Sequence, residues 1–190
     1  MRRSTSKFDG LRLIDIWDLP HPEWILICPG DGLPERPWAK APHGWSVRCA
    51  PRGAYEFMLP AAHHLQFQEM LRHAAALIDD RRSCIVVYPS WQPRVSGIAL
   101  LVDQELLLEA VQGPLEPLAR GVVTPDLYLS FEGPLFNRLR ECRGNSGLLS
   151  PIELSRLTTP LKRVSVDAAL SLEWVVTDCD EVMYFDWHEL

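Results

Sequence analysis

The chain has 190 residues, of which 47% are hydrophobic and 23% are charged, and this is the size and composition of one globular domain or of two small lobes that share a core. Because 19 Lys and Arg residues stand against 25 Asp and Glu residues, the formal net charge of -6 excludes the broad basic surface that nucleic-acid binding requires. No apolar run approaches the roughly 20 residues of a membrane span, so we expect a soluble protein with neither nucleic acid nor membrane among its partners.

The N-terminal residues and the cysteines favour the cytoplasm. The basic start, Met1 to Lys7, is not followed by the apolar stretch of a signal peptide. The five cysteines are odd in number, far apart and never in Cys-x-x-Cys pairs, so they suggest neither a disulfide framework nor a thiolate zinc site. We therefore expect a reducing, cytoplasmic location.

The first third of the chain predicts two strands and a helix. Residues 1–23 are polar and contain two prolines, which indicates a strand or an arm leading into the fold. A short apolar run at 24–28 ends in a Pro-Gly-Asp-Gly turn, and residues 44–50 alternate as a strand does. Pro60 then opens an amphipathic helix of about four turns. His63 and His64 are neighbours on this predicted helix, so their side chains diverge, and a surface location is favoured over a metal site.

Further strands and helices follow. The strands are predicted at 83–88, at 97–102 and 106–110, which a tight hairpin joins, and at 122–131. A short helix is expected between Pro114 and Gly121. Ser150 and Glu153 have the spacing of a capping box, which predicts that another helix begins there.

Apolar and polar residues alternate on both sides of a turn at 177–180, which predicts a C-terminal β-hairpin. If Val176 faces Glu181, then Glu173 faces Tyr184, and directly opposed residues share one face of the ribbon. Glu173, Asp186 and His188 then lie on the polar face. The predicted apolar face consists of Leu172, Trp174, Val176, Met183, Phe185 and Trp187.

Several short strings follow one another in an order found in a known family. They are Val47-Arg48-Cys49-Ala50, Ser96-Gly97-Ile98-Ala99, Glu109 to Glu116, Gly121-Val122-Val123-Thr124-Pro125-Asp126 and Leu172-Glu173-Trp174. This order resembles the nucleotide-binding domain of phosphoenolpyruvate synthase and pyruvate phosphate dikinase. The resemblance implies an α+β, ATP-grasp-like fold with a mixed or antiparallel sheet and flanking helices. We expect one such domain over residues 1–190, in which 1–43 form a divergent N-terminal arm and strand and 44–190 form the family-like core.

The resemblance also implies a set of site residues. In the family, ATP is held by a lysine in a Gly-rich loop, an arginine in the Val-Arg strand, a glutamate before the tryptophan and a Gln-x-Arg pair on the last strand. Arg48 and Glu173 match this pattern, whereas Asp186 and His188 stand in the place of the last pair once one inserted residue is allowed. The lysine loop is missing or shortened. The implied site is therefore a truncated, degenerate one made of Arg48, Glu173, Asp186 and His188, with Glu173 and Asp186 as Mg²⁺ ligands.

The loss of cations leads to the first functional hypothesis. Phosphoryl transfer relies on fixed positive charges, and removal of one transition-state arginine can cost about 10³- to 10⁵-fold in rate. We expect a non-catalytic accessory or interaction protein, a pseudoenzyme, whose binding of ATP and Mg²⁺ is weak or lost. Most of the seven tryptophans are expected in the core, but a chain that has lost a lobe would expose aromatic surface where that lobe once packed, which predicts a protein partner or a homo-oligomer.

Two alternatives stay open. The chain could be a reduced ATP-dependent phosphotransferase or another nucleotide-binding protein, with a basic residue from elsewhere supplying the missing charge. It could also be a small metal-binding domain that uses Glu173, Asp186 and His188, because carboxylate and imidazole groups suit divalent ions. In a purely structural interpretation, Arg48 is a salt-bridged residue on a sheet and the three C-terminal residues form a solvated polar face.

Overall fold

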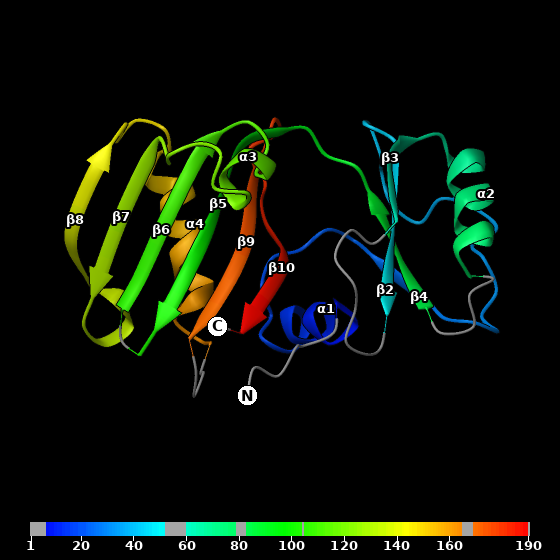
Figure 1. Ribbon diagram of the computed structural model, residues 1–190, viewed down its shortest axis with the longest axis horizontal. Helices are drawn as coiled ribbons and strands as arrows, with labels where there is room; N and C mark the ends of the chain where they lie inside the picture. Colours follow the sequence, from blue (N-terminus) through cyan, green and yellow to red (C-terminus); the bar gives the residue numbers. More distant parts are fainter. Residues whose placement is uncertain (1–6, 52–59, 79–82, 104, 165–168, 190) are drawn as a thin grey trace. The chain divides into compact units, whose positions relative to one another are not determined.

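The computed structural model describes residues 7–51, 60–78, 83–103, 105–164 and 169–189. The chain divides into two units, each built on its own antiparallel sheet (Figure 1). The N-terminal unit consists mainly of residues 22–92 and the C-terminal unit mainly of residues 93–190. None of the helices in the described part of the chain is long and apolar enough to cross a membrane.

Helix α1 (Lys7–Ile16) forms where the sequence predicted an arm or a strand. Leu11 and Ile14 are three residues apart, which places them on one side of a helix, and they are 6% and 0% exposed. Full burial of one such side chain contributes about 1.5–3 kcal/mol. The division between the units falls within α1, so Leu11 belongs to the N-terminal unit and Ile14 to the C-terminal unit. Burial of these two residues therefore favours a helix in a segment whose overall composition is polar.

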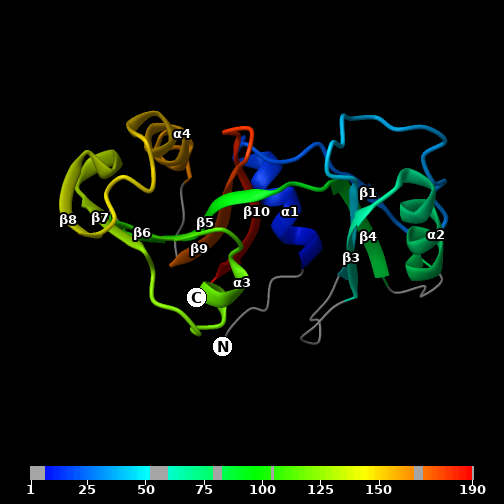
Figure 2. The same cartoon turned by 90° about the horizontal axis from the view of Figure 1, so that it is seen from above.

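The sheet of the N-terminal unit has four antiparallel strands in the order β1-β4-β2-β3, and α2 (Phe67–Ile78) covers one face (Figures 1 and 2). The strands are β1 (Ile25–Ile27), β2 (Trp45–Pro51), β3 (Ala61–Leu65) and β4 (Ser83–Pro89). Met70 and Ala74 of α2 are fully buried in a cluster with Trp45, Val47 and Val87. The strands predicted at 24–28, 44–50 and 83–88 are thus confirmed.

The predicted start of the helix at Pro60 is wrong. Residues Ala61–Leu65 pair with β2 as strand β3, and the helix begins only at Phe67. The backbone N–H of Gln66 donates to Oε2 of Glu69 at 3.1 Å, which satisfies one of the free donors at the helix start. Strand pairing to the edge of β2 outweighs the local helical pattern because it gives residues 61–65 backbone partners.

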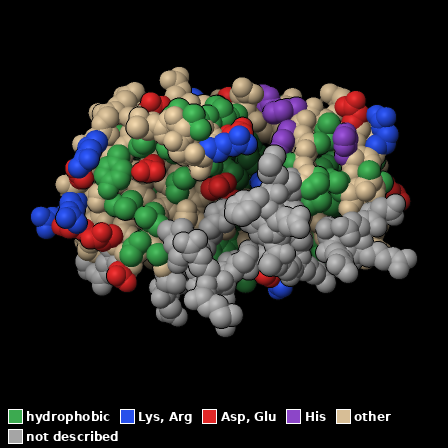
Figure 3. All heavy atoms as spheres, viewed as in Figure 1, with side chains coloured by type: hydrophobic (Ala, Val, Ile, Leu, Met, Phe, Trp, Pro, Cys, Tyr) green, Lys and Arg blue, Asp and Glu red, His purple; other side chains and the backbone are tan. Residues whose placement is uncertain are grey.

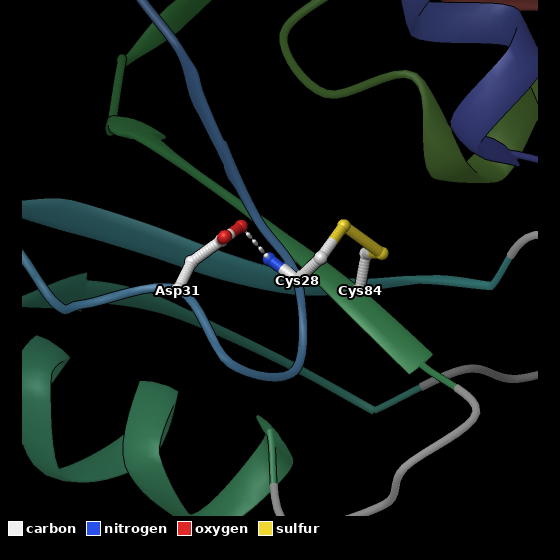
Figure 4. The surroundings of a disulfide bond; sticks show 3 residues. All are labelled: Cys28, Asp31 and Cys84. Carbon is white, nitrogen blue, oxygen red and sulfur yellow. Dashed lines mark hydrogen bonds between the residues drawn. A yellow bond between two sulfur atoms is a disulfide. The ribbon is translucent and has the colours of Figure 1, made fainter.

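A disulfide joins β4 to the end of β1 (Figure 4). Ile27 pairs with Ile85 in this antiparallel ladder, so Cys28 and Cys84 are the next residues on neighbouring strands although they are 56 positions apart in sequence. Oδ2 of Asp31 accepts a hydrogen bond from the backbone N–H of Cys28 at 2.7 Å. The cysteine spacing did not suggest this bond, because only the strand pairing brings the two residues together. Cys49, Cys142 and Cys179 are not part of a disulfide.

The sheet of the C-terminal unit has six antiparallel strands in the order β10-β9-β5-β6-β7-β8 (Figure 1). They are β5 (Pro93–Val102), β6 (Glu105–Gln112), β7 (Leu127–Glu132), β8 (Arg138–Gly144), β9 (Leu170–Thr177) and β10 (Val182–Glu189). Both predicted hairpins, β5–β6 and β9–β10, are confirmed. Strand β8 was not predicted, and the extended segment expected from Val122 becomes a strand only at Leu127. The 3-10 turn η1 (Pro134–Phe136) connects β7 to β8.

Two helices lie on opposite sides of this sheet (Figure 2). Helix α4 (Pro151–Leu161) begins with the predicted capping box: the backbone N–H of Glu153 donates to Oγ of Ser150 at 3.3 Å, and the N–H of Ser150 donates to Oε2 of Glu153 at 2.7 Å. The short helix α3 (Glu116–Ala119) begins two residues after the predicted Pro114. Antiparallel sheets with flanking helices confirm the α+β class.

The register of the C-terminal hairpin differs from the predicted one. Tyr184 pairs with Trp174, and a β-bulge at Phe185 then brings Asp186 opposite Glu173. Tyr184 therefore belongs to the apolar face. Its side chain is 0% exposed, and its hydroxyl donates to the carbonyl oxygen of Leu157 in α4. The buried face of β9 and β10 is thus the one that α4 covers.

Candidate functional site

The four predicted site residues lie in two different units. Arg48 is on β2 of the N-terminal unit, whereas Glu173 is on β9 and Asp186 and His188 are on β10 of the C-terminal unit. The backbone of His188 pairs with Ser171, but its side chain lies outside the described part of the structure. Arg48 and the three C-terminal residues therefore belong to separate sheets.

In the C-terminal unit, Glu173 and Asp186 are directly opposed on neighbouring strands. Directly opposed Cβ atoms are about 4.5–5.5 Å apart, compared with about 7–8 Å for the diagonal arrangement that the sequence predicted. Asp186 is only 5% exposed, and its Oδ1 accepts a hydrogen bond from the backbone N–H of Trp187 at 2.9 Å. The bulge at Phe185 thus brings the two carboxylates closer together than simple alternation would.

This pair belongs to a row of side chains that crosses the sheet. Glu173 pairs with Ile98, Ile98 with Glu109, and Glu109 with Tyr128. The row lies on the face opposite to the one that carries Trp174 and α4, because neighbouring residues on a strand point to opposite sides. Half-buried Glu109 was not among the predicted site residues. A carboxylate between apolar residues of one strand is a sequence feature that could have indicated it. It lies two strand spacings, about 10 Å, from Glu173, so it is a neighbour of the pair rather than part of it.

Two directly opposed carboxylates offer the oxygen ligands that a small divalent cation prefers. Mg²⁺ is bound through one or two carboxylates together with substrate phosphates and water, rather than by an all-protein cage. No cluster of three or more His, Cys, Asp and Glu side chains with the geometry of a metal site occurs among the described residues. The donor set of Glu173 and Asp186 therefore fits Mg²⁺ that arrives with a phosphate ligand, and these two residues would hold that ion.

Arg94, the second residue of β5, has a structural role. Arg94 forms an ion pair with Glu153 at the start of α4 and a second one, at 3.3 Å, with Asp180 in the β9–β10 turn. Burial of Glu153 acts to raise its pKa, but hydrogen bonds from Ser150 and the nearby Arg94 outweigh burial and hold that pKa below its usual value. Arg94 is thus committed to joining α4 to the hairpin.

In the N-terminal unit, Arg48 belongs to a polar cluster on the face of the sheet opposite α2. Ser46, Arg48 and Tyr88 share this face, since Ser46 pairs with Tyr88 and Arg48 with Val86. The hydroxyl of Tyr88 is hydrogen-bonded to the side chains of Arg48 and Ser46, and Tyr88 is only 6% exposed. Burial raises the pKa of Tyr88, although the charge of Arg48 and these hydrogen bonds oppose the rise. The guanidinium is thus held in place by a neutral phenol.

Two histidines complete this cluster, and the sequence had placed them wrongly on a helix. Nδ1 of His63 lies 2.9 Å from Oγ of Ser46, which in turn lies 2.7 Å from Oγ of the buried Ser90. The backbone N–H of His64 donates to the same Ser90 hydroxyl at 3.0 Å. Histidine side chains gather at the surface of the N-terminal unit (Figure 3). His63 and His64 are both classed as exposed. Strand β3 thus brings two titratable groups beside Arg48, as sequence spacing alone could not show.

The predicted tryptophan-rich surface is not found. All seven tryptophans are buried or half-buried, and the large apolar side chains that are exposed are Ile16, Val122, Val123, Leu135, Leu139 and Ile152. Trp17 packs edge-on against Trp187, with ring centroids 5.8 Å apart, and Trp38 packs against Trp45. The tryptophans are therefore used within the protein, and the expected partner or homo-oligomer stays a prediction.

No protein-family model matches the chain, and no curated protein matches it in sequence. Solved structures do match its fold. They include the D-alanine-D-alanine ligases from Helicobacter pylori (TM-score 0.58, 11% identity, 98% of this chain and 54% of the ligase) and from Bacillus anthracis complexed with ATP (TM-score 0.56, 10% identity, 98% and 55%).

The ADP complex of the N5-carboxyaminoimidazole ribonucleotide synthetase PurK matches as well, with a TM-score of 0.59, 10% identity, and coverage of 97% of this chain and 44% of PurK. The chain thus spans about half the length of these proteins. At such low identity the likeness shows the fold, and it confirms that this chain has the fold of the ATP-grasp enzymes.

Proposed function

We propose that this chain is a nucleotide-binding domain of the ATP-grasp type, similar to that of the phosphoenolpyruvate synthase and pyruvate phosphate dikinase family, which binds a magnesium nucleotide without transferring its phosphoryl group. The observation that carries the proposal is the opposed pair Glu173 and Asp186 on the face of the sheet opposite α4, in a chain with the ATP-grasp fold. Among proteins with this fold, one of the solved structures is a complex with ATP and another with ADP.

The chemistry of the pair supports magnesium binding. Glu173 and Asp186 are directly opposed, so their carboxylate oxygens are suited to serve together as ligands of one divalent cation. Mg²⁺ keeps several ligand positions for phosphate oxygens and water, and two protein carboxylates leave those positions available. When bound, the ion would supply positive charge to the phosphates of the nucleotide, and the two residues would orient it.

The balance of charges supports binding without transfer. Compared with the family pattern, the chain lacks the lysine loop and has Asp186 and His188 where a glutamine and an arginine are expected. Phosphoryl transfer depends on cations that are positioned around the phosphate in the transition state. A site that has lost two fixed cations and gained a carboxylate retains metal affinity but has little means of stabilising that transition state.

Calorimetric titration of the full chain with ADP and ATP, each with and without Mg²⁺, tests the proposal. We expect binding that requires Mg²⁺ and is weakened at least about tenfold in both Glu173→Gln and Asp186→Asn, because each change removes one ligand charge. Glu105→Gln is the matched control, since Glu105 is an exposed carboxylate on another strand, paired with Arg140 at 3.4 Å. A saturating nucleotide at 100 times its dissociation constant would also stabilise the fold by about 2.7 kcal/mol.

The same samples decide among the alternatives. Magnesium-dependent binding with no release of ADP from ATP over hours supports the proposal. Turnover of ATP that is lost in Glu173→Gln identifies a reduced phosphotransferase instead. Absence of binding at millimolar nucleotide, or equal binding in both variants and the wild type, rejects the proposed site.

A further inference from the structure

The hydroxyl groups of Ser46 and Ser90 fix the orientation of the His63 ring. Nδ1 of His63 contacts Oγ of Ser46 at 2.9 Å, and Ser46 is 1% exposed and contacts Ser90 at 2.7 Å. Ser90 in turn accepts a hydrogen bond from the backbone N–H of His64. Because one ring nitrogen is held from within the protein, Nε2 is the nitrogen that an exposed His63 offers to a ligand.

We propose that Arg48 and His63 form an oxyanion-binding site on the N-terminal unit, and that binding of the anion is coupled to protonation of His63. The ligand is a tetrahedral oxyanion such as a phosphate group. That the natural source of this group is a nucleotide rests on the proposed function. The site itself needs neither a nucleobase nor a metal ion to bind the anion.

The charges around His63 explain the coupling. Arg48 on β2 and His64 on β3 are the neighbouring basic groups, and Tyr88 on β4 stays a neutral phenol at physiological pH. Partial burial, followed by the charges of Arg48 and His64, lowers the pKa of His63 below its usual value. The ring is therefore neutral at pH 7. An anion bound beside Arg48 cancels the repulsion that keeps His63 neutral, so it favours the protonated ring.

The hydrogen bonds allow both protonation states. In the neutral ring, Ser46 donates to Nδ1 and the ring proton lies on Nε2, where it can be donated to an anion. When the ring is protonated, Nδ1 becomes a donor to Ser46, whose hydroxyl then turns toward Ser90 or Tyr88. The Ser46 hydroxyl can thus accept from His63 and donate to Ser90, so the contacts of His63 with Ser46 and of Ser46 with Ser90 are both kept when the ring gains its charge.

Sulfate is a suitable probe because it is tetrahedral and does not titrate between pH 5.5 and 8, in the range where histidine does. Binding to the full chain is followed by NMR of the histidine rings at several pH values, without nucleotide or Mg²⁺. We expect sulfate to bind about tenfold more tightly at pH 5.5 than at pH 8, and by linkage bound sulfate raises the proton affinity of His63.

Three variants separate the contributions. In His63→Gln, which keeps a donor but cannot titrate, sulfate binding becomes independent of pH. In Arg48→Lys, chosen because it retains the charge, binding weakens but stays pH-dependent, whereas Arg48→Gln abolishes it. His73→Gln, an exposed histidine on α2, is the control and leaves binding unchanged.

The proposal is overturned if wild-type sulfate binding is absent at pH 5.5, if it does not depend on pH, or if His63→Gln behaves as the wild type. Its failure is distinct from failure of the nucleotide proposal. Wild-type protein that binds sulfate but does not bind magnesium ADP rejects the nucleotide function and leaves the oxyanion site in place.

Discussion

Replacement of Gly97 by alanine tests the packing that sets the position of the carboxylate pair. Gly97 on β5 pairs with Trp174 on β9, next to the pair formed by Ile98 and Glu173. A Cβ atom at residue 97 would lie 2.1 Å from the carbonyl oxygen of Glu109 and 2.2 Å from Cζ2 of Trp174. The indole is fully buried, so it cannot move away without opening a space elsewhere, and the backbone oxygen cannot move without breaking the β5–β6 ladder.

We expect Gly97→Ala to lower the free energy of unfolding by about 2–4 kcal/mol, which combines overpacking with displacement of a large core side chain. Urea unfolding followed by circular dichroism and tryptophan fluorescence measures this loss. The matched control is Gly32→Ala, because nothing lies within 4 Å of a Cβ at Gly32, and its stability should stay within about 0.5 kcal/mol of the wild type. A Gly97→Ala protein as stable as the wild type would refute the stated register of β5 and β9.

Two further predictions concern other parts of the fold. Reduction of the Cys28–Cys84 disulfide, or replacement of both residues by alanine, should lower the free energy of unfolding by about 4 kcal/mol, because a bond across 56 residues restricts the unfolded chain. Cys142→Ala, which changes a cysteine outside the disulfide, is the control. Urea midpoints that do not change with reductant would contradict this prediction. Glu153→Gln should cost about 1–3 kcal/mol at pH 7 because it weakens the contacts with Arg94 and Ser150. Since the folded pKa of Glu153 lies below its usual 4.5, the stabilisation is present above pH 4.5 and is lost as the pH falls through the folded pKa. Urea midpoints between pH 3 and pH 7 should therefore decline less steeply in the variant, and equal slopes would disprove the assignment.

Local signals in the sequence predicted much of the secondary structure. Ser150 and Glu153 form the capping box because their spacing alone decides whether the two reciprocal hydrogen bonds can form. The β5–β6 and β9–β10 hairpins follow from alternation on both sides of short polar turns. The helix at Lys7–Ile16 was missed because its apolar residues do not all lie on one side: Leu11 and Ile14 are buried, whereas Ile16 is 68% exposed.

The candidate site was predicted in part. The sequence placed Glu173 and Asp186 on one face of the last hairpin, and the structure agrees on the face while changing the register. A bulge adds one residue to one strand, and no alternation pattern reveals which residue is left over. The same limit explains His63, whose helical surroundings in sequence gave no sign that it pairs with β2.

Periodicity and turn residues within a few neighbouring positions were enough to predict most of the strands, and the resemblance to a known family implied the class of fold. Which distant residues meet could not be predicted in this way, because it depends on how the strands pair. Cys28 and Cys84, His63 and Ser46, and Glu173 and Asp186 become neighbours through strand pairing, and strand pairing is chosen by the burial of whole faces rather than by the residues that end up in contact.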